Sequence, residues 1–361
     1  MSIFKPRTEG LWFRFQTLFS AIIFLSLSLA FFIKSYTTSP MTCHQSSNSS
    51  SSEKFAGDLD SLCYVQGTYL VSHALDLTVG EEVISPGGGE AAGDVGGQKI
   101  FLNYYQWSGW MFLSFAIILI VVYCGWRFVE RGQIDRLMKS VRKATDEDDD
   151  EQLKSLLMQP NYIGTYLLIN YTIFEVLLMV IVILAIFFAN HMLNGEFWSY
   201  GTMLAFEFLG IRRIKSTVRG RIFPNRAKCS IHDLNGYGKI TQYNAICTLT
   251  NNYAYSILYF AAWFYFMLLL KIVITSLLVR ILFYCNHRTK LHSIEPLFPK
   301  RFANITELTR NLRPSSAFLL YVVSNNMNTD QIEKMARLMV TGSRTSSRRN
   351  SNDHLEMNSK V

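Results

Sequence analysis

Four of the six cysteines in this chain have a spacing that allows disulfide chemistry. Cys43 and Cys63 lie 20 residues apart, and Cys229 and Cys247 lie 18 residues apart in a later polar segment. Thiols that occur in even number in an oxidising compartment usually form disulfides. Zinc ligands come in much closer pairs, so a metal site is not expected here. The sequence therefore predicts two disulfides and leaves three ways of pairing these cysteines open.

Residue types that carry out catalysis show no comparable arrangement. The seven histidines are scattered and lie mostly in polar segments. The chain has no His-Glu metal pair, no nucleophile motif and no glycine-rich loop that could hold a phosphate. We therefore expect no enzyme, no cofactor, no metal and no nucleic-acid partner.

The composition indicates which elements position the cysteines. The chain has 361 residues, of which 49% are hydrophobic and only 17% charged, and its mean hydropathy is positive. A membrane-spanning helix needs about 20 apolar residues, because all backbone groups must be paired within lipid. Four stretches have that length: 11–33, 104–126, 163–189 and 255–279. The predicted fold class is an all-α membrane protein with four transmembrane helices.

The distribution of basic residues orients these four helices. The loop 34–103 holds 3 Lys or Arg, the loop 127–162 holds 7, and the tail after residue 279 holds 13. Cytoplasmic segments are rich in Lys and Arg, so both termini and loop 127–162 are expected in the cytoplasm. The loops 34–103 and 190–254 are then extracellular. Loop 190–254 holds 8 Lys or Arg, but the rule is weak for long loops.

A basic start before the apolar stretch 11–33 is also typical of a signal peptide. That stretch is long for a signal peptide, however, and the residues after it offer no clear cleavage site. We therefore interpret it as the first transmembrane helix. The orientation places Cys124 and Cys285 on the cytoplasmic side, apart from the four cysteines in the two long loops.

Aromatic residues mark the start of the second transmembrane stretch, where the sequence reads NYYQWSGW. Tryptophan and tyrosine favour the boundary between lipid and water. Tyr104, Tyr105 and Trp107 are therefore expected to form an interfacial collar.

The motif YYQW also carries a resemblance to a known family. Tyr104, Tyr105, Gln106 and Trp107 open the second of four spans, as in the innexins, the invertebrate gap-junction proteins related to pannexins. Further segments that resemble this family are KSYTTSPMTC, CYVQGTY, IFPNRAKC, AICTLTNNYAYSILYFAAWFYF and AFLLYVVSNNMNTDQIEKMARLM. The resemblance covers residues 10–340. It departs from the family where Ser108 and Gly109 replace a usual Val-Pro, so a proline kink is not expected in this helix.

The resemblance implies a subunit of a large-pore gap-junction channel that passes ions and small metabolites between cells. It implies a homo- or hetero-oligomer of about eight like subunits around one axis, in the plasma membrane. It also implies that Cys43 pairs with Cys247 and Cys63 with Cys229. Residues 1–10 would form an N-terminal pore segment, with Lys5, Arg7 and Glu9 as candidates for lining the pore.

Two other functions stay open at this point. Asn48 begins a glycosylation sequon in the first long loop, and a glycan there would hinder docking to a channel on a neighbouring cell. The first alternative is therefore an undocked, pannexin-like hemichannel. The second is a four-span adhesion or scaffold protein that conducts nothing.

Two charged residues lie within predicted spans. Charges at membrane depth usually face water or a partner. Counted from the expected outer ends of their helices, Glu175 and Lys271 lie at similar depth. We therefore predict an ion pair between them.

The C-terminal part is expected to be cytoplasmic. Residues 280–340 resemble the helical domain of the family, and residues 341–361 have the composition of a disordered tail. Ser351 follows two arginines and an asparagine, which suits a basophilic kinase. The chain terminates at Val361 in a sequence that a PDZ domain could bind.

Overall fold

A computed structural model describes residues 11–45, 58–75, 98–130, 132–146, 162–210, 217–234, 238–286, 288, 314–324, 326 and 331–332. The chain forms two compact units, and the division between them falls within the long helices. Unit 1 comprises Met1–Leu18, Ile120–Val180 and Lys271–Val361, and unit 2 comprises Phe19–Leu119 and Ile181–Leu270. Each unit is described by itself.

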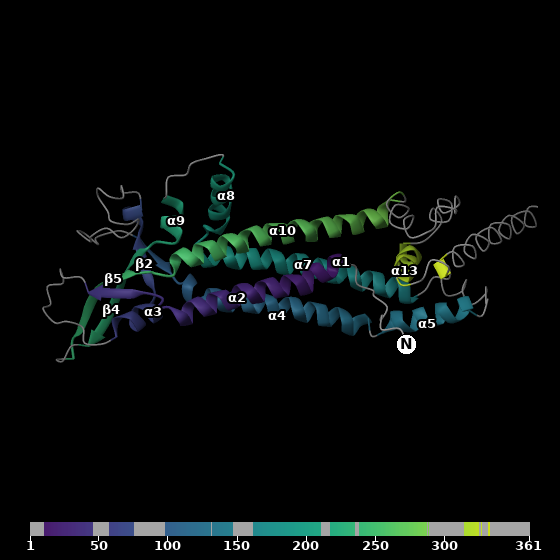
Figure 1. Cartoon of the computed structure of the whole chain (residues 1–361), viewed down its shortest axis with the longest axis horizontal. Helices are drawn as coiled ribbons and strands as arrows, with labels where there is room; N and C mark the ends of the chain where they lie inside the picture. The colour runs from purple at the N-terminus through teal and green to yellow at the C-terminus, as the bar shows by residue number, and fades with distance from the viewer. Residues whose placement is uncertain are drawn as a thin grey trace, which may run out of the picture. The chain divides into compact units, whose positions relative to one another are not determined.

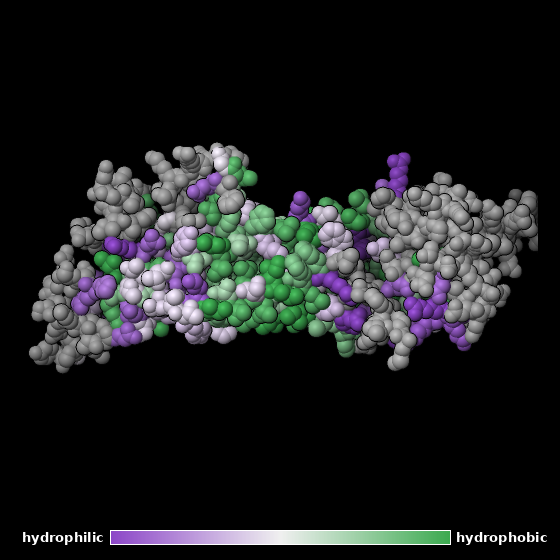
Figure 2. Space-filling view, in the orientation of Figure 1, coloured by the Kyte–Doolittle hydropathy of each residue, from purple (hydrophilic) through white to green (hydrophobic). Residues whose placement is uncertain are grey.

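In the part of the chain that the structure describes, four apolar helical segments are long enough to cross a membrane, which confirms the predicted four-span fold. The first consists of α1 (Leu11–Arg14), a π-helical segment η1 (Phe15–Phe19) and α2 (Ser20–Thr37); the others are α4 (Tyr104–Glu130), α7 (Tyr162–Met192) and α10 (Asn252–Cys285). Apolar side chains gather on the outer surface of these helices (Figure 2). These exposed apolar side chains form the surface that lipid or a neighbouring copy would bury.

Unit 2 contains a five-stranded antiparallel sheet that the sequence did not predict (Figure 1). Its strands are β1 (Thr42–Gln45), β2 (Thr68–Val71), β3 (Lys99–Leu102), β4 (Arg226–Leu234) and β5 (Ile240–Thr248). The spatial order is β1-β5-β4-β2-β3. Strands from the loop before α4 therefore lie on both sides of the β4–β5 hairpin, which comes from the loop before α10. The two long loops thus form one sheet.

Short helices complete unit 2: α3 (Leu59–Gln66), the 3-10 turn η2 (Ser72–Leu75), α8 (Phe197–Phe208) and α9 (Thr217–Ile222). Helix α8 approaches α10 very closely. A Cβ atom on Gly201 would lie 2.1 Å from the ring of Trp263, so only glycine fits at this contact. Aromatic rings fill the interior between the helices, with Phe24, Phe31, Phe112, Tyr259 and Phe266 all buried.

Among its described residues, unit 1 contains two further helices, α5 (Gln133–Asp146) and α13 (Pro314–Ser324). Buried apolar residues of α13 pack into the unit: Ala317, Phe318, Leu319, Leu320, Val322 and Val323. At Gly164 of α7 an added Cβ would lie 3.2 Å from the carbonyl oxygen of Ser315, so the two backbones approach closely. The Arg142 guanidinium of α5 donates to the carbonyl of Asn326 at 3.2 Å. These contacts place the segment around α13 against α7 and α5.

The aromatic collar expected at the start of α4 is only partly present. Trp107 is 56% exposed, but Tyr104 and Tyr105 are 1% and 5% exposed. Both tyrosines pack inside unit 2, where Tyr104 contacts the rings of Phe223 and Tyr259. Their rings therefore fill the protein core, and Trp107 alone of the three faces outward.

Candidate functional site: a disulfide-linked domain of two loops

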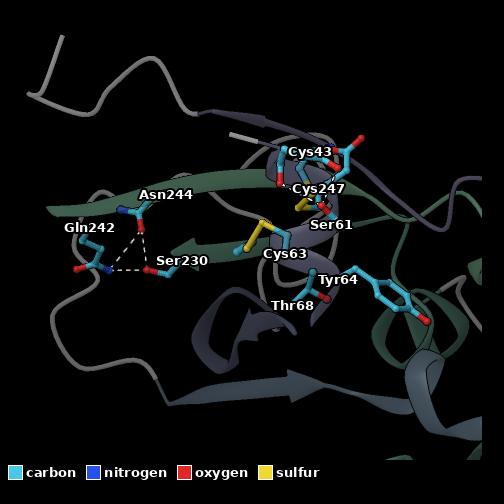
Figure 3. Close-up of a disulfide and its surroundings, with 12 residues drawn as sticks. Cys43, Ser61, Cys63, Tyr64, Thr68, Ser230, Gln242, Asn244 and Cys247 are labelled. Carbon is cyan, nitrogen blue, oxygen red and sulfur yellow. Dashed lines mark hydrogen bonds between the residues drawn. A yellow bond between two sulfur atoms is a disulfide. The ribbon is translucent and has the colours of Figure 1, made fainter. Parts of the chain in front are cut away.

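Two disulfides join the long loops within unit 2 (Figure 3). Cys43 of β1 is bonded to Cys247 of β5, and Cys63 of α3 is bonded to Cys229 of β4. Of the three pairings that the sequence left open, this is the one that the resemblance implied. Each bond links one cysteine before α4 to one after α7, so the two loops are covalently one domain.

The alternation of side chains along β4 and β5 brings the cysteines inside. Successive side chains of a strand point to opposite faces. Cys229, Ile231, Tyr243, Ala245 and Cys247 face inward and are buried. The opposite face carries polar side chains, among which Ser230, Gln242 and Asn244 are linked by hydrogen bonds (Figure 3). This face is the exterior of the domain, and it also exposes Ile240 and Ile246 of β5.

Helix α3 is fixed at its N-terminal end. The Asp60 carboxylate accepts a hydrogen bond from the backbone N–H of Cys43 at 2.6 Å, which ties α3 to β1. Ser61 donates to the carboxylate of Asp58 at 2.6 Å, and this bond lowers the pKa of Asp58. An ionised carboxylate at this position is favoured by the dipole of the helix.

The C-terminal end of α3 is fixed by the YYQW motif. The Gln106 side-chain amide donates to the carbonyl oxygens of Tyr64 and Val65. The Tyr105 hydroxyl accepts from the backbone N–H of Thr68 at 3.0 Å. The four C-terminal carbonyls of a helix have no partner within the helix, so Gln106 satisfies groups that would otherwise be unpaired. The family motif therefore binds the helix that carries Cys63.

The four sulfur atoms lie close together. The Sγ atoms of Cys43, Cys63 and Cys247 are all within 4.8 Å of one another. Such a group could hold a metal ion by distance alone, but here each sulfur is already part of a disulfide. The two bonds thus form one compact cystine cluster.

In unit 1, the ion pair of Glu175 differs from the one predicted. Glu175 is bonded to Arg280 at 3.1 Å and accepts from Ser276 at 2.8 Å, so its partner is Arg280 instead of Lys271. Lys271 is exposed and lies nine residues before Arg280 in α10, a distance of roughly 13 Å along the helix. Counting residues from the expected ends of the two helices therefore did not predict which charges meet.

The Arg280 side chain also stacks on two aromatic rings. Its guanidinium lies 4.6 Å from the ring centre of Tyr171 in α7 and 5.5 Å from that of Phe318 in α13. Arg280 therefore links its own helix α10 to two further elements of unit 1, α7 and α13. The sequence did not indicate this role, because Arg280 directly follows Val279, where the predicted span ends, whereas α10 continues to Cys285.

Several predicted residues lie outside the described part of the chain. These are the pore candidates Lys5, Arg7 and Glu9, the sequon at Asn48, the phosphorylation candidate Ser351 and the C-terminal Val361.

Four membrane-spanning segments and two loops joined by disulfides define a multi-pass membrane protein with a cystine-linked domain. The innexin family model matches residues 10–342. The chain therefore belongs to the innexin family. Innexins form gap-junction channels and are not enzymes, which confirms the predicted function class.

Individual relatives agree with this assignment. The chain is 25% identical to innexin inx1 of Schistocerca americana over 332 residues, which are 89% of either chain. It is 25% identical to innexin shaking-B of Drosophila melanogaster over 335 residues, 90% of this chain and 87% of the relative. Identity to innexin inx2 of Drosophila melanogaster is 27% over 279 residues, 74% of this chain and 73% of the relative.

Proposed function

We propose that this innexin is an oligomeric channel subunit whose disulfide-linked domain faces the outside of the cell and docks to a channel of a neighbouring cell. The observation that carries the proposal is the linkage of both long loops by Cys43–Cys247 and Cys63–Cys229. A docking surface must keep its shape while it meets a partner. Two disulfides restrict the conformations open to the linked loops, which supports such a rigid surface.

Redox chemistry supports the orientation. Disulfides persist in the extracellular compartment and are rare in the cytosol. The linked loops therefore belong outside, and both termini and loop 127–162 belong in the cytoplasm. Cys124 and Cys285 are free and exposed, and both would lie toward the reducing side. The excess of Lys and Arg in loop 127–162 and in the C-terminal segment agrees with this orientation.

The pore and the cytoplasmic tail complete the proposal. About eight subunits would surround one axis. Residues 1–10 would line the pore mouth, where Lys5 and Arg7 outweigh Glu9 and favour anions. Ser351 would accept a phosphate, and Val361 would bind a PDZ domain. A glycan on Asn48 would stand near the docking surface and limit docking.

Paired cells that express only this chain test the proposal. We expect junctional conductance between the two cells, measured by dual voltage clamp, and transfer of a small dye. The matched control is the Asn48→Gln variant, which removes the sequon and should conduct at least as well. Membrane current in single cells without junctional current between paired cells, for both the parent and Asn48→Gln, would contradict docking. If chains reach the cell surface and carry no current at all, the proposed channel function is wrong.

Orientation is tested separately by tags at residue 1 and after residue 361 in intact cells. We expect antibody access only after permeabilisation. Antibody binding to either tag in intact cells would show that the proposed orientation is wrong, and it would not bear on the proposed channel function.

A further inference from the structure

In the cystine cluster, Cys63 lies near two cysteines that are not its partner, and it could form a disulfide with either of them. Its Sγ atom lies within 4.8 Å of the Sγ atoms of Cys43 and Cys247, which are not its partners. Disulfide exchange proceeds by attack of a thiolate on a bonded sulfur. A Cys63 thiolate could attack Cys43, form a Cys43–Cys63 bond and release Cys247 as a thiolate. One sulfur–sulfur bond would form and one would break, with no net oxidation. Proximity alone therefore does not select the native pairs.

The direction of the Cys63 side chain depends on the end of α3. Cys63 lies four residues before Gly67, whose N–H donates to the Cys63 carbonyl at 3.1 Å and closes the last turn. The next two carbonyls, those of Tyr64 and Val65, accept from Gln106. Each side chain of a helix projects outward from the axis in its own direction, about 100° from that of the residue before it. A rotation of α3 about its axis would therefore turn the Cys63 side chain away from Cys229.

Four side-chain contacts oppose such a rotation. Gln106 holds the carbonyls of the last turn, and Tyr105 binds the N–H of Thr68 directly after the helix. The rings of Tyr64 and Tyr105 pack with their centres 5.4 Å apart. At the other end, Asp60 holds the backbone of Cys43. Helix α3 is therefore fixed at both ends relative to the two competing cysteines.

We propose that Tyr105 and Gln106 are positioning residues that select the disulfide pairing. They orient α3 so that Cys63 meets Cys229, and thereby keep it from Cys43 and Cys247. The role explains why a glutamine stands among aromatic residues at the start of an apolar helix. Trp107, the last residue of the motif, is 56% exposed and cannot take over this role.

Peptide mapping of the full-length, membrane-embedded chain tests the proposal. Cells are quenched in acid, thiols are blocked, and the partners of Cys63 are quantified without reduction. We expect Tyr105→Phe/Gln106→Leu to lower the ratio of Cys63–Cys229 to mispaired Cys63 by about fivefold or more. Fivefold corresponds to one lost hydrogen bond of about 1 kcal/mol. Trp107→Leu is the matched control and should keep the native ratio. An unchanged ratio in the double variant would overturn the proposal.

A second background separates selection from general unfolding. In Cys43→Ser/Cys247→Ser chains, Cys63 has no competing partner within the cluster. There the Tyr105→Phe/Gln106→Leu variant should form Cys63–Cys229 as completely as the parent. If Cys63 stays unpaired there, the motif acts only on overall folding and the proposed selection is wrong. Total chain is mapped in both backgrounds, so the result does not depend on arrival at the cell surface.

Discussion

The cystine cluster of unit 2 and the Glu175–Arg280 cluster of unit 1 both hold distant segments together, the first by covalent bonds and the second by an ion pair. Both join segments that are far apart in sequence: the disulfides close separations of 204 and 166 residues, and the ion pair closes one of 105. The disulfides are covalent and persist when the chain unfolds. The ion pair exists only while α7, α10 and α13 are packed together.

This difference indicates how each region responds to change. A disulfide stabilises mainly by restricting the unfolded chain, so its effect does not require perfect packing around it. A buried ion pair must be complete, because a charge left without its partner is strongly destabilising. Unit 2 should therefore tolerate substitutions of polar residues at its surface but not the loss of a disulfide-bonded cysteine. Unit 1 should be sensitive to the removal of either charge of the Glu175–Arg280 pair.

The largest effect is expected from breaking the covalent link with Cys63→Ser. The variant should lose about 4 kcal/mol of stability, since the closed loop is long, and its junctional current should be abolished. Dual voltage clamp, with surface biotinylation to count the chains, measures this loss. Cys124→Ser, a change at a free and exposed cysteine, is the control and should behave like the parent. Normal coupling by Cys63→Ser would show that the link is dispensable.

Removing one charge of the ion pair is expected to have the next largest effect. Arg280→Met leaves Glu175, which is 3% exposed, without its partner and should cost about 3 kcal/mol. Arg280→Lys keeps the charge but loses the fork geometry and the ring contacts, so its loss should be smaller. Unfolding in mixed detergent micelles measures the free energies.

The double variant Glu175→Leu/Arg280→Met sharpens this second prediction. It removes both charges together, so it should recover most of the stability that Arg280→Met loses. A double variant that is no more stable than Arg280→Met would show that packing of Arg280 on Tyr171 and Phe318 matters more than the charge.

Overpacking of α8 should have a smaller effect, although it lies in the covalently linked unit. Gly201→Ala places a Cβ within 2.1 Å of the Trp263 ring, and overpacking of this kind costs about 2 kcal/mol. The disulfides do not prevent the loss, because neither of them lies in α8. The loss of stability is measured as a lower unfolding temperature, monitored by size-exclusion chromatography of heated samples. Gly109→Ala, which meets only the edge of Phe32 at 3.0 Å, should unfold at a higher temperature than Gly201→Ala; the reverse order would contradict the packing argument.

The smallest effect is expected at the exposed ion pair of α5. Lys139 and Asp135 lie 2.9 Å apart, but the Lys139 side chain is 75% exposed. Exposed pairs one turn apart contribute at most about 0.5 kcal/mol, and salt screens them. Lys139→Gln should therefore leave unfolding nearly unchanged at physiological salt. A loss as large as that of Arg280→Met would mean that exposure does not separate this pair from Glu175–Arg280.

The spans were predictable because lipid imposes a length and a composition on each helix. All four predicted stretches lie largely within observed helices, and α4 begins at Tyr104 as expected. The ends were less predictable, because a charged residue such as Arg280 can lie within a helix, with its side chain only 17% exposed, when a partner reaches it. The local pattern around Arg280 contains no sign of Glu175, which is 105 residues earlier.

The candidate site was predictable in its chemistry but not in its architecture. Cysteine number and topology indicated two disulfides, and the resemblance implied which cysteines pair. Strands β1, β2 and β3 were missed because they have only four residues each, which is too short for a clear alternation. Strands β4 and β5 have nine residues each, and their alternation of buried and exposed side chains was a signal that could have predicted the hairpin. The roles of Tyr105 and Gln106 were missed because position at a membrane boundary is a common explanation for aromatic residues, and a buried contact with a distant helix leaves no local signal.

The interleaved strand order has a consequence for the time course of synthesis. Cys43 must wait for Cys247, which is 204 residues later. At about 5–20 residues per second, this interval lasts roughly 10–40 s. Cys43 and Cys63 are therefore both on the nascent chain long before either native partner exists, and a bond between them is the first that oxidation can make. Tyr105 and Gln106 follow Cys63 by only about 40 residues, so they emerge early in this interval, while Cys229 and Cys247 are still unmade.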